Sequence, residues 1–413
     1  MQLIKQLFLF LMFSSVLYST EHYELFVDPY YSPYMGSALF LTGHKSLEKI
    51  EDQWIFPSTP PKRGVLASVG RIVELTLFWN PINSLICVVQ HEVFGHGYRA
   101  RSLHDVAKVK SYSIGKPSPY GHGGGATFMS YKETIKIGQI QSVAIGGLES
   151  ESILAREQKI KWLSSGYINP KSASLYDMAA LSSFIYTFAQ KDDKFFSGND
   201  LETYVNLLNI LYPNDQISRH KLRSALKYNF IDPMLYYDIA ASWYYIFTGK
   251  SLSIPMISLG SVSCLPNVHV DLAPYGIEYY LENYFLYEKS PFYTYIKAGK
   301  HGGNKYYGCG VHYDELIQSD KMSMGFRFDG WYQPNFLADW ELEQLFEGYR
   351  YRFVTTQLAT SKLGAAASIV SRICINNTLS FFYSDIGYKT EGYLPGFPLQ
   401  KSMTLRLGFS ASF

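Results

Sequence analysis

The chain has 413 residues, and its 37 basic and 35 acidic side chains leave it almost neutral. That balance excludes the broad positive surface that nucleic-acid binding needs, so we expect no nucleic-acid partner. Charged residues make up 17% of the chain and aromatic residues 16%, whereas soluble proteins carry about 25% charged residues. The low charge suggests a surface that is partly solvated by something other than water. Four cysteines without a C-x-x-C pair exclude both a disulfide scaffold and a cysteine-built zinc site.

The N-terminus has the pattern of an export signal. Lys5 is the only charge before Glu21, and residues 7–18 form an apolar run of twelve residues, which is too short to cross a bilayer. We therefore predict a signal peptide over 1–20 and an exported protein, with a buried N-terminal helix as the alternative. Residues 21–66 are rich in Tyr and Pro, and we predict that they form an extended arm.

Residues 67–250 show mostly helical spacing of apolar side chains and are predicted to form a helical domain. An expected break at Asn80-Pro81 divides the uncharged stretch 75–90 into two buried core helices, so we predict no conventional transmembrane helix. Two short strands around a Gly- and Pro-rich turn are expected between about residues 108 and 131.

In residues 251–413 the apolar period changes to two. From 322 to 329, for example, Met and Phe alternate with small or charged residues. The segment is long enough for about eight or more antiparallel strands, which we predict to close into a β-barrel. The expected fold class is thus α+β, with a helical metallopeptidase-like domain followed by the barrel.

The pattern of the last strand indicates which kind of barrel to expect. Leu405, Leu407, Phe409 and Phe413 share one face, and the chain ends on that phenylalanine. This resembles the terminal strand of bacterial outer-membrane β-barrel proteins, and the resemblance implies a transmembrane barrel in the outer membrane. The high Tyr content suits the aromatic girdles of such barrels. The alternative is a soluble β-sandwich with one wet face, located in the periplasm.

Residues 91–96 (HEVFGH) combine the side chains of a hydrolytic zinc site. His91 and His96 would hold the metal, and Glu92 would take a proton from water as general base. The common H-E-x-x-H spacing separates its histidines by four residues, whereas these are five apart. Both rings can reach one ion only where the helix loosens into a π-type turn, and Gly95 supplies backbone freedom there.

This segment resembles the H-E-x-x-G-H motif of the dipeptidyl-peptidase III family of zinc peptidases. The resemblance covers the motif alone and implies a zinc cofactor, with a glutamate on a later helix as the third ligand. Glu149 follows His96 by 53 residues and is the first choice, with Glu151 as the alternative. The family's two-lobed architecture has no counterpart here, so its dipeptide-releasing specificity is not carried over.

The glycine-rich stretch 120–127 is a candidate edge strand beside a peptide substrate, with Tyr120 or His122 stabilising the oxyanion. A flexible turn is the alternative. Together these features predict a zinc-dependent peptide hydrolase of the bacterial outer membrane, acting on a peptide or protein substrate. The alternative function is a non-enzymatic outer-membrane barrel or pore with the helical domain as a plug. Intramembrane cleavage is disfavoured because helices of spanning length are not expected.

Overall fold

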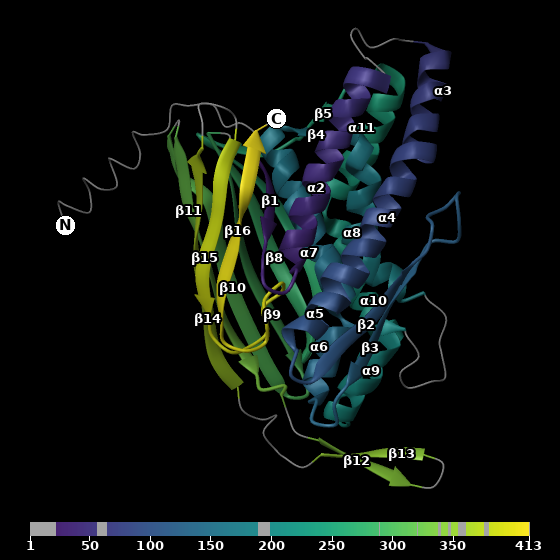
Figure 1. The fold of residues 1–413 in the computed structure, drawn as a ribbon, viewed down its shortest axis with the longest axis vertical. Helices are drawn as coiled ribbons and strands as arrows, with labels where there is room; N and C mark the ends of the chain where they lie inside the picture. Colours follow the sequence, from purple (N-terminus) through teal and green to yellow (C-terminus); the bar gives the residue numbers. More distant parts are fainter. Residues whose placement is uncertain are drawn as a thin grey trace, which may run out of the picture.

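A computed structural model describes residues 22–55, 64–188, 199–288, 290–319, 321–337, 340–345, 348–353, 361–375 and 380–412. The described chain combines helices with a large antiparallel sheet, and the helices pack along one side of that sheet (Figure 1). The predicted signal peptide at 1–20 and the C-terminal Phe413 lie outside the described residues.

The main sheet has ten strands in the order β1-β16-β15-β14-β11-β10-β9-β8-β7-β6. Their bounds are β1 (His22–Val27), β6 (Ile257–Leu259), β7 (Val262–Ala273), β8 (Gly276–Tyr287), β9 (Ser290–His301), β10 (Asn304–Ser319), β11 (Met322–Pro334), β14 (Ser361–Cys374), β15 (Ser380–Lys389) and β16 (Ser402–Ser412). The predicted antiparallel sheet is confirmed, but it is open: β1 and β6 are its edges, and no pairing among the described residues closes it into a barrel. Three two-stranded sheets accompany it: β2 (Ala107–Ile114) with β3 (Gly125–Tyr131), β4 (Tyr167–Ile168) with β5 (Leu252–Ser253), and β12 (Trp340–Leu345) with β13 (Gly348–Phe353).

Helices fill the side of the sheet where a closed barrel would have its lumen. The α-helices are α2 (Pro33–Ile50), α3 (Val65–Val73), α4 (Asn80–His91), α5 (Gly97–Ser102), α6 (Ile137–Ala144), α7 (Gly146–Ser165), α8 (Ala173–Tyr186), α9 (Asp200–Leu211), α10 (Arg219–Leu226) and α11 (Pro233–Thr248). Short π-helical segments η1 (Glu51–Ile55), η2 (Glu74–Trp79) and η3 (Glu92–His96) and 3-10 segments η4 (Pro170–Ser172) and η5 (Lys227–Ile231) connect them. The central helix α7 contacts β7, β8 and β9, and α2 contacts β1 at the edge of the sheet.

The N-terminal segment is not the extended arm that its Tyr and Pro content predicts. It begins with β1, where Tyr23 pairs with Ala411 of β16, and continues as the 18-residue helix α2. The hydroxyl of Ser32 accepts a hydrogen bond from the backbone N–H of Met35 and so caps this helix. Pro33 then occupies the first turn, where its missing N–H costs nothing. Pro33 therefore begins a helix, although the proline content of the segment predicts extended structure.

The break predicted at Asn80-Pro81 does not occur either. Residues Val65–Ser102 form one continuous helical stretch, and it is the one stretch in the described chain that is long and apolar enough to cross a membrane. In α-helical register Pro81 cannot donate to the carbonyl of Leu77. That carbonyl instead accepts a hydrogen bond of 2.6 Å from the hydroxyl of Tyr120, at the tip of the β2–β3 hairpin. The helix reaches Pro81 through the π-helical segment η2, where the N–H of Asn80 donates to the carbonyl of Leu75, five residues earlier. The hairpin adds a donor for the carbonyl of Leu77.

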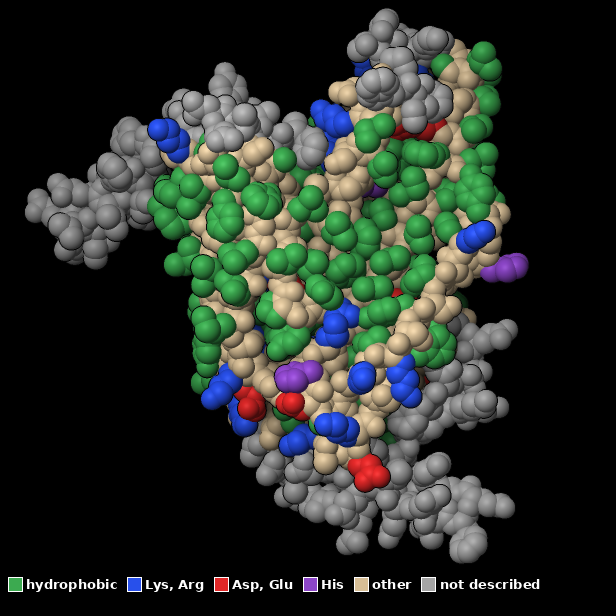
Figure 2. Space-filling model, in the orientation of Figure 1, with side chains coloured by type: hydrophobic (Ala, Val, Ile, Leu, Met, Phe, Trp, Pro, Cys, Tyr) green, Lys and Arg blue, Asp and Glu red, His purple; other side chains and the backbone are tan. Residues whose placement is uncertain are grey.

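The main sheet is apolar outside and charged inside. In β16 the predicted alternation is confirmed: Leu405, Leu407 and Phe409 are exposed, whereas Arg406 faces the helices and is buried. The register continues this pattern across neighbouring strands. One such row is exposed on four strands and consists of Phe326, Ile369, Ile386 and Leu405. Figure 2 shows that apolar side chains also cover the adjoining helices, while most charged side chains in this view gather at the lower end.

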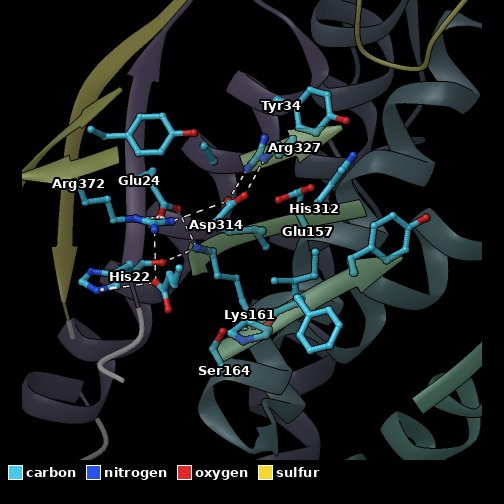
Figure 3. A pocket seen from close by; sticks show the side chains of 18 of the residues that line it. His22, Glu24, Tyr34, Glu157, Lys161, Ser164, His312, Asp314, Arg327 and Arg372 are labelled. Atoms are coloured by element: carbon cyan, nitrogen blue, oxygen red, sulfur yellow. Dashed lines mark hydrogen bonds and ion pairs between the residues drawn. The ribbon is translucent and has the colours of Figure 1, made fainter. Parts of the chain in front are cut away.

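The buried charges of the inner face form ion pairs. Arg406 binds Asp385 at 2.8 Å, and Lys297 binds Glu278 at 2.8 Å. Figure 3 shows a cavity of about 80 Å³ on this face, where Lys161 and Arg372 both bind Glu24 at 2.7 Å. Because its cations are paired with acids, we assign the cavity to the polar interior and not to an anion site.

Candidate metal centre

The segment from His91 to His96 adopts the π-type turn that the five-residue spacing requires. The helix is α-helical up to His91 and becomes π-helical over η3. The backbone N–H of Gly97 donates to the carbonyl of Glu92, five residues earlier, which is the hydrogen bond of a π-helix. The extra residue in this turn brings both imidazole rings to the same side of the helix, and their centroids lie 4.8 Å apart.

Two glycines let this turn lie against the start of α7. A Cβ on Gly95 would stand 2.6 Å from the carbonyl oxygen of Gly146, and a Cβ on Gly147 would stand 2.3 Å from Nε2 of His91. Gly95 is therefore needed for the close approach of two backbones, in addition to the freedom predicted for the turn. Any side chain at Gly147 would displace the His91 ring.

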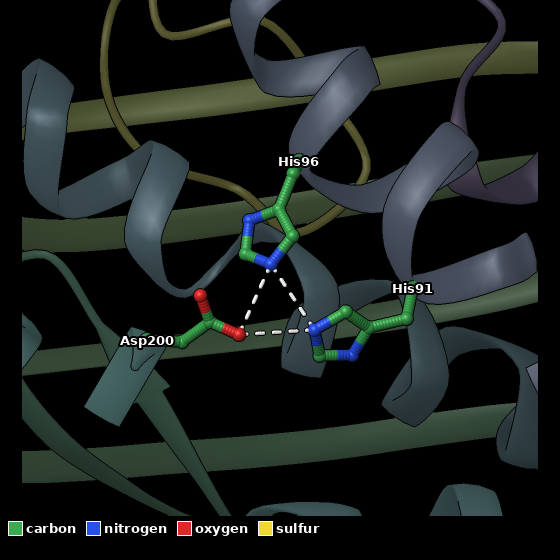
Figure 4. A group of neighbouring side chains, drawn as sticks. All are labelled: His91, His96 and Asp200. Atoms are coloured by element: carbon green, nitrogen blue, oxygen red, sulfur yellow. Dashed lines mark hydrogen bonds and ion pairs between the residues drawn. The ribbon is translucent and has the colours of Figure 1, made fainter. Parts of the chain in front are cut away.

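Three possible ligand atoms converge beside η3 (Figure 4). Nε2 of His91 lies 3.1 Å from Nε2 of His96, and both lie within 3.1 Å of Oδ2 of Asp200. Asp200 comes from the first turn of α9, whose N-terminus is capped by Asn199. Burial favours the neutral acid, but the His96 and His91 rings hold the pKa of Asp200 well below its usual value. In the described chain this is the one group of three such residues placed to hold a metal ion.

The outer nitrogens of both rings are engaged by fixed acceptors. Nδ1 of His96 lies 2.7 Å from the carbonyl oxygen of Val143, and Nδ1 of His91 lies 3.1 Å from Oε2 of Glu151. Since a carbonyl oxygen can only accept, Nδ1 of His96 carries the hydrogen. The contact of Nδ1 of His91 with Glu151 is an ion-pair contact without hydrogen-bond geometry. Metal-ligating histidines are normally oriented in this way by a second partner. Burial favours neutral rings, but the neighbouring acids, Glu151 for His91 and Asp200 for both, raise the pKa of the two histidines.

Two arrangements can bring these three atoms together: protonated rings whose Nε2–H groups donate to Asp200, or neutral rings with a metal cation between the three atoms. With Zn–N and Zn–O bonds of about 2.0–2.2 Å, tetrahedral ligand atoms lie roughly 3.3–3.5 Å apart. The observed triangle, with sides of 3.0–3.1 Å, is within a few tenths of an ångström of that size. The residues therefore fit a small divalent metal such as zinc.

The two glutamates predicted as third ligands lie elsewhere. Glu149 is fully buried against Arg99, whose Nε donates to it at 2.8 Å, and it also accepts the backbone N–H of Gly396. Glu151 contacts Nδ1 of His91, the nitrogen remote from Asp200, and accepts a hydrogen bond from Cys87. Glu149 thus anchors the loop before β16, and Glu151 orients a ligand. The structure brings Asp200 to the third position.

Glu92 lies beside the cluster and is held by β3. The hydroxyl of Thr127 donates to Oε2 of Glu92 at 2.6 Å, and Glu92 is close enough to act electrostatically on His96 and Tyr186. The hydroxyl of Tyr186 lies 3.2 Å from Nε2 of His91, and the two rings stack. The sequence analysis names Glu92 and includes Thr127 in the stretch 120–127, but it names neither Tyr186 nor Asp200.

Tyr120 and His122 are not brought to the cluster. Tyr120 is 62% exposed and binds the carbonyl of Leu77, which is fourteen residues, or about 21 Å of α-helix, before His91. His122 is exposed in the same turn. Residues 120–124 of the predicted edge strand belong to the turn of the hairpin, as in the alternative interpretation, and only residues 125–127 belong to β3, which reaches Glu92 through Thr127.

Comparison with protein-family models, with curated proteins and with solved structures returns no match to this chain. The assignment of each site residue therefore depends on geometry and chemistry alone.

Proposed function

We propose that the protein is a metal-dependent peptide hydrolase, with zinc as the expected metal. The observation that carries this proposal is the convergence of His91, His96 and Asp200 within 3.1 Å of one another beside the carboxylate of Glu92. Two histidines and a carboxylate with a glutamate next to them are the parts of a hydrolytic zinc site. The resemblance of residues 91–96 to the dipeptidyl-peptidase III motif points to the same chemistry.

Each residue of the centre has a role in the proposed reaction. A zinc ion held by the three ligands would polarise the scissile carbonyl and lower the pKa of a water molecule toward about 7. Glu92 accepts the proton of the attacking water and returns it to the leaving amine. The hydroxyl of Tyr186 is placed to donate to the oxygen that becomes negative during the attack. Thr127 orients Glu92 through its hydrogen bond.

Metal removal tests this function. We expect a chelator to reduce hydrolysis of a fluorogenic peptide by the purified full chain to background, and about one equivalent of zinc per chain to restore it, since three protein ligands bind one ion. Magnesium serves as the control because it prefers six oxygen ligands. Hydrolysis that persists after complete removal of the metal would contradict the proposal.

We further propose that the protein spans a membrane, the outer membrane being the expected one. Support comes from the inverted sheet, in which Ile369 and its neighbours across the strands are exposed while the charges are buried. In a soluble sandwich the apolar face would be buried and the charged face would be exposed. The helical side continues the apolar surface: α11 exposes a stripe at helical spacing, formed by Tyr236, Ile239, Trp243 and Phe247. Helices would then complete the lipid-facing wall that the open sheet leaves unfinished. Helices on the inner face also fit the plug of the alternative function, so metal content and peptide hydrolysis separate the two functions.

The substitution Ile369→Arg tests whether the outer face of the main sheet contacts lipid or water. Ile369 is 57% exposed and lies between Phe326 and Ile386 on the outer face. An arginine in the middle of a lipid-facing strand destabilises a barrel by about 2–4 kcal/mol. We expect that loss in the free energy of folding into lipid vesicles, measured by urea titration. Unchanged stability would contradict a lipid-facing sheet, because a water-exposed site tolerates this change.

A further inference from the structure

The strand β3 crosses the mouth of the candidate metal centre. Near its start, a Cβ on Gly125 would lie 2.6 Å from Cγ of Glu92, and Thr127 binds the Glu92 carboxylate. At its end, Tyr131 is close enough to Asp200 to be affected by its charge. The strand therefore passes from the general base to the third ligand.

One edge of β3 is open to a partner strand. β3 pairs with β2 along one side, and among the described residues no strand pairs with its other side. An unpaired edge presents backbone N–H and C=O groups that an extended peptide can match. A peptide paired there would run past Glu92 and Asp200, as a substrate of the centre must.

The surroundings of the site are apolar. Phe128, next to Thr127, is 52% exposed, and Ile185, next to Tyr186, is 54% exposed. Phe188, two residues further along, is 60% exposed. The guanidinium of Arg223 lies over the Phe188 ring, 3.9 Å from its centroid. A peptide bound here would therefore meet apolar side chains at Phe128 and Ile185.

The helix that carries the site presents an uncharged surface up to it. From residue 65 to 90 the only charged residues are Arg71 and Glu74, and both are buried. Exposed charges follow directly after the site, at His104, Asp105 and Lys108. Along this helix, the centre thus lies where the uncharged stretch gives way to the water-exposed end. The hairpin tip beside Leu77 adds the exposed side chains of Lys116 and His122 to the flank of the uncharged stretch.

We propose that the substrate is an extended segment of a membrane-inserted protein, which reaches the centre at the boundary of the bilayer and binds as an added strand along β3. This inference rests on the proposed hydrolase function and specifies its substrate class. The open edge supplies backbone hydrogen bonds, and Phe128 and Ile185 contact the apolar side chains of the segment.

The test compares two substrates in the same vesicles. The zinc-loaded full chain is reconstituted in phosphatidylethanolamine–phosphatidylglycerol vesicles and given a fluorogenic apolar peptide, either free in water or fused to the end of a transmembrane helix. We expect kcat/KM for the fused peptide to be at least about tenfold higher, because contacts remote from the cleaved bond lower the barrier. N-methylation of alternate peptide bonds should lower kcat/KM for both peptides, because it removes the N–H groups that pair with β3.

Two variants of Phe128 complete the test. Phe128→Glu should lower kcat/KM for both peptides by about tenfold, because both carry the apolar side chains that contact Phe128, whereas Phe128→Leu should behave as wild type. Zinc content reports that each variant is folded. Equal cleavage of both substrates, with no effect of Phe128→Glu or N-methylation, would overturn this inference and leave the hydrolase intact. Failure of the zinc-loaded protein to cleave either substrate would overturn both.

Discussion

Replacing Glu92 with glutamine is expected to abolish peptide hydrolysis while the metal stays bound. Glu92 is not one of the three converging ligands, and its carboxylate is held by Thr127 beside them. A glutamine keeps the shape and can still accept the Thr127 hydrogen bond, but it cannot take a proton from water. Loss of a general base lowers kcat by about 10²–10⁴. The measurement is kcat on a fluorogenic peptide together with the zinc content of the same sample.

The matched control is Glu133→Gln, which removes an exposed carboxylate from the loop just after β3. It should leave both activity and zinc unchanged. A Glu92→Gln variant that is as active as wild type would show that another group acts as the base. Loss of zinc from that variant would show instead that Glu92 is a ligand.

Replacing Asp200 with alanine is expected to remove both the metal and the activity. Its Oδ2 is the third of the converging atoms, and two histidines alone leave the ion with too few protein ligands. We expect the zinc content to fall below about a tenth of that of wild type. Zinc per chain after dialysis against a weak chelator is the measurement.

Glu149→Gln provides the comparison for this experiment. Glu149 was the ligand suggested by the family resemblance, but its carboxylate is bound by Arg99 and by the N–H of Gly396. The variant should therefore keep its zinc, although its folding is weakened. Zinc retained by Asp200→Ala and lost from Glu149→Gln would reverse the assignment.

The sequence predicts the local part of the centre better than the distant part. The five-residue spacing of His91 and His96 is a property of one helix, so the need for a π-type turn follows from helix geometry alone. Asp200 is 104 residues beyond His96, and nothing in its local pattern, an ordinary capped helix start, distinguishes it from other acidic residues at helix starts. The contact between α9 and η3 depends on how the intervening helices pack, which the sequence pattern does not encode.

For the fold as well, the sequence predicts the local features and not those that depend on distant contacts. The alternation in residues 402–411 predicts a strand and its two faces, because period two is a local property. Closure of the sheet depends on what meets its edges, and α2 lies against β1. The residue pattern predicts that Pro81 ends a helix, but the helix continues after the π-helical segment η2, and Tyr120 donates to the carbonyl of Leu77. Local propensity does not predict a contact with a residue so far along the chain.

Metal content of the gently purified wild-type chain tests the central claim most directly. If His91, His96 and Asp200 hold an ion, elemental analysis should find about one zinc per chain, and X-ray absorption should show nitrogen and oxygen neighbours at about 2.0–2.2 Å with no sulfur. A chain that contains no transition metal and does not bind added zinc would contradict the account. The three groups would then form only a proton-bridged hydrogen-bond network.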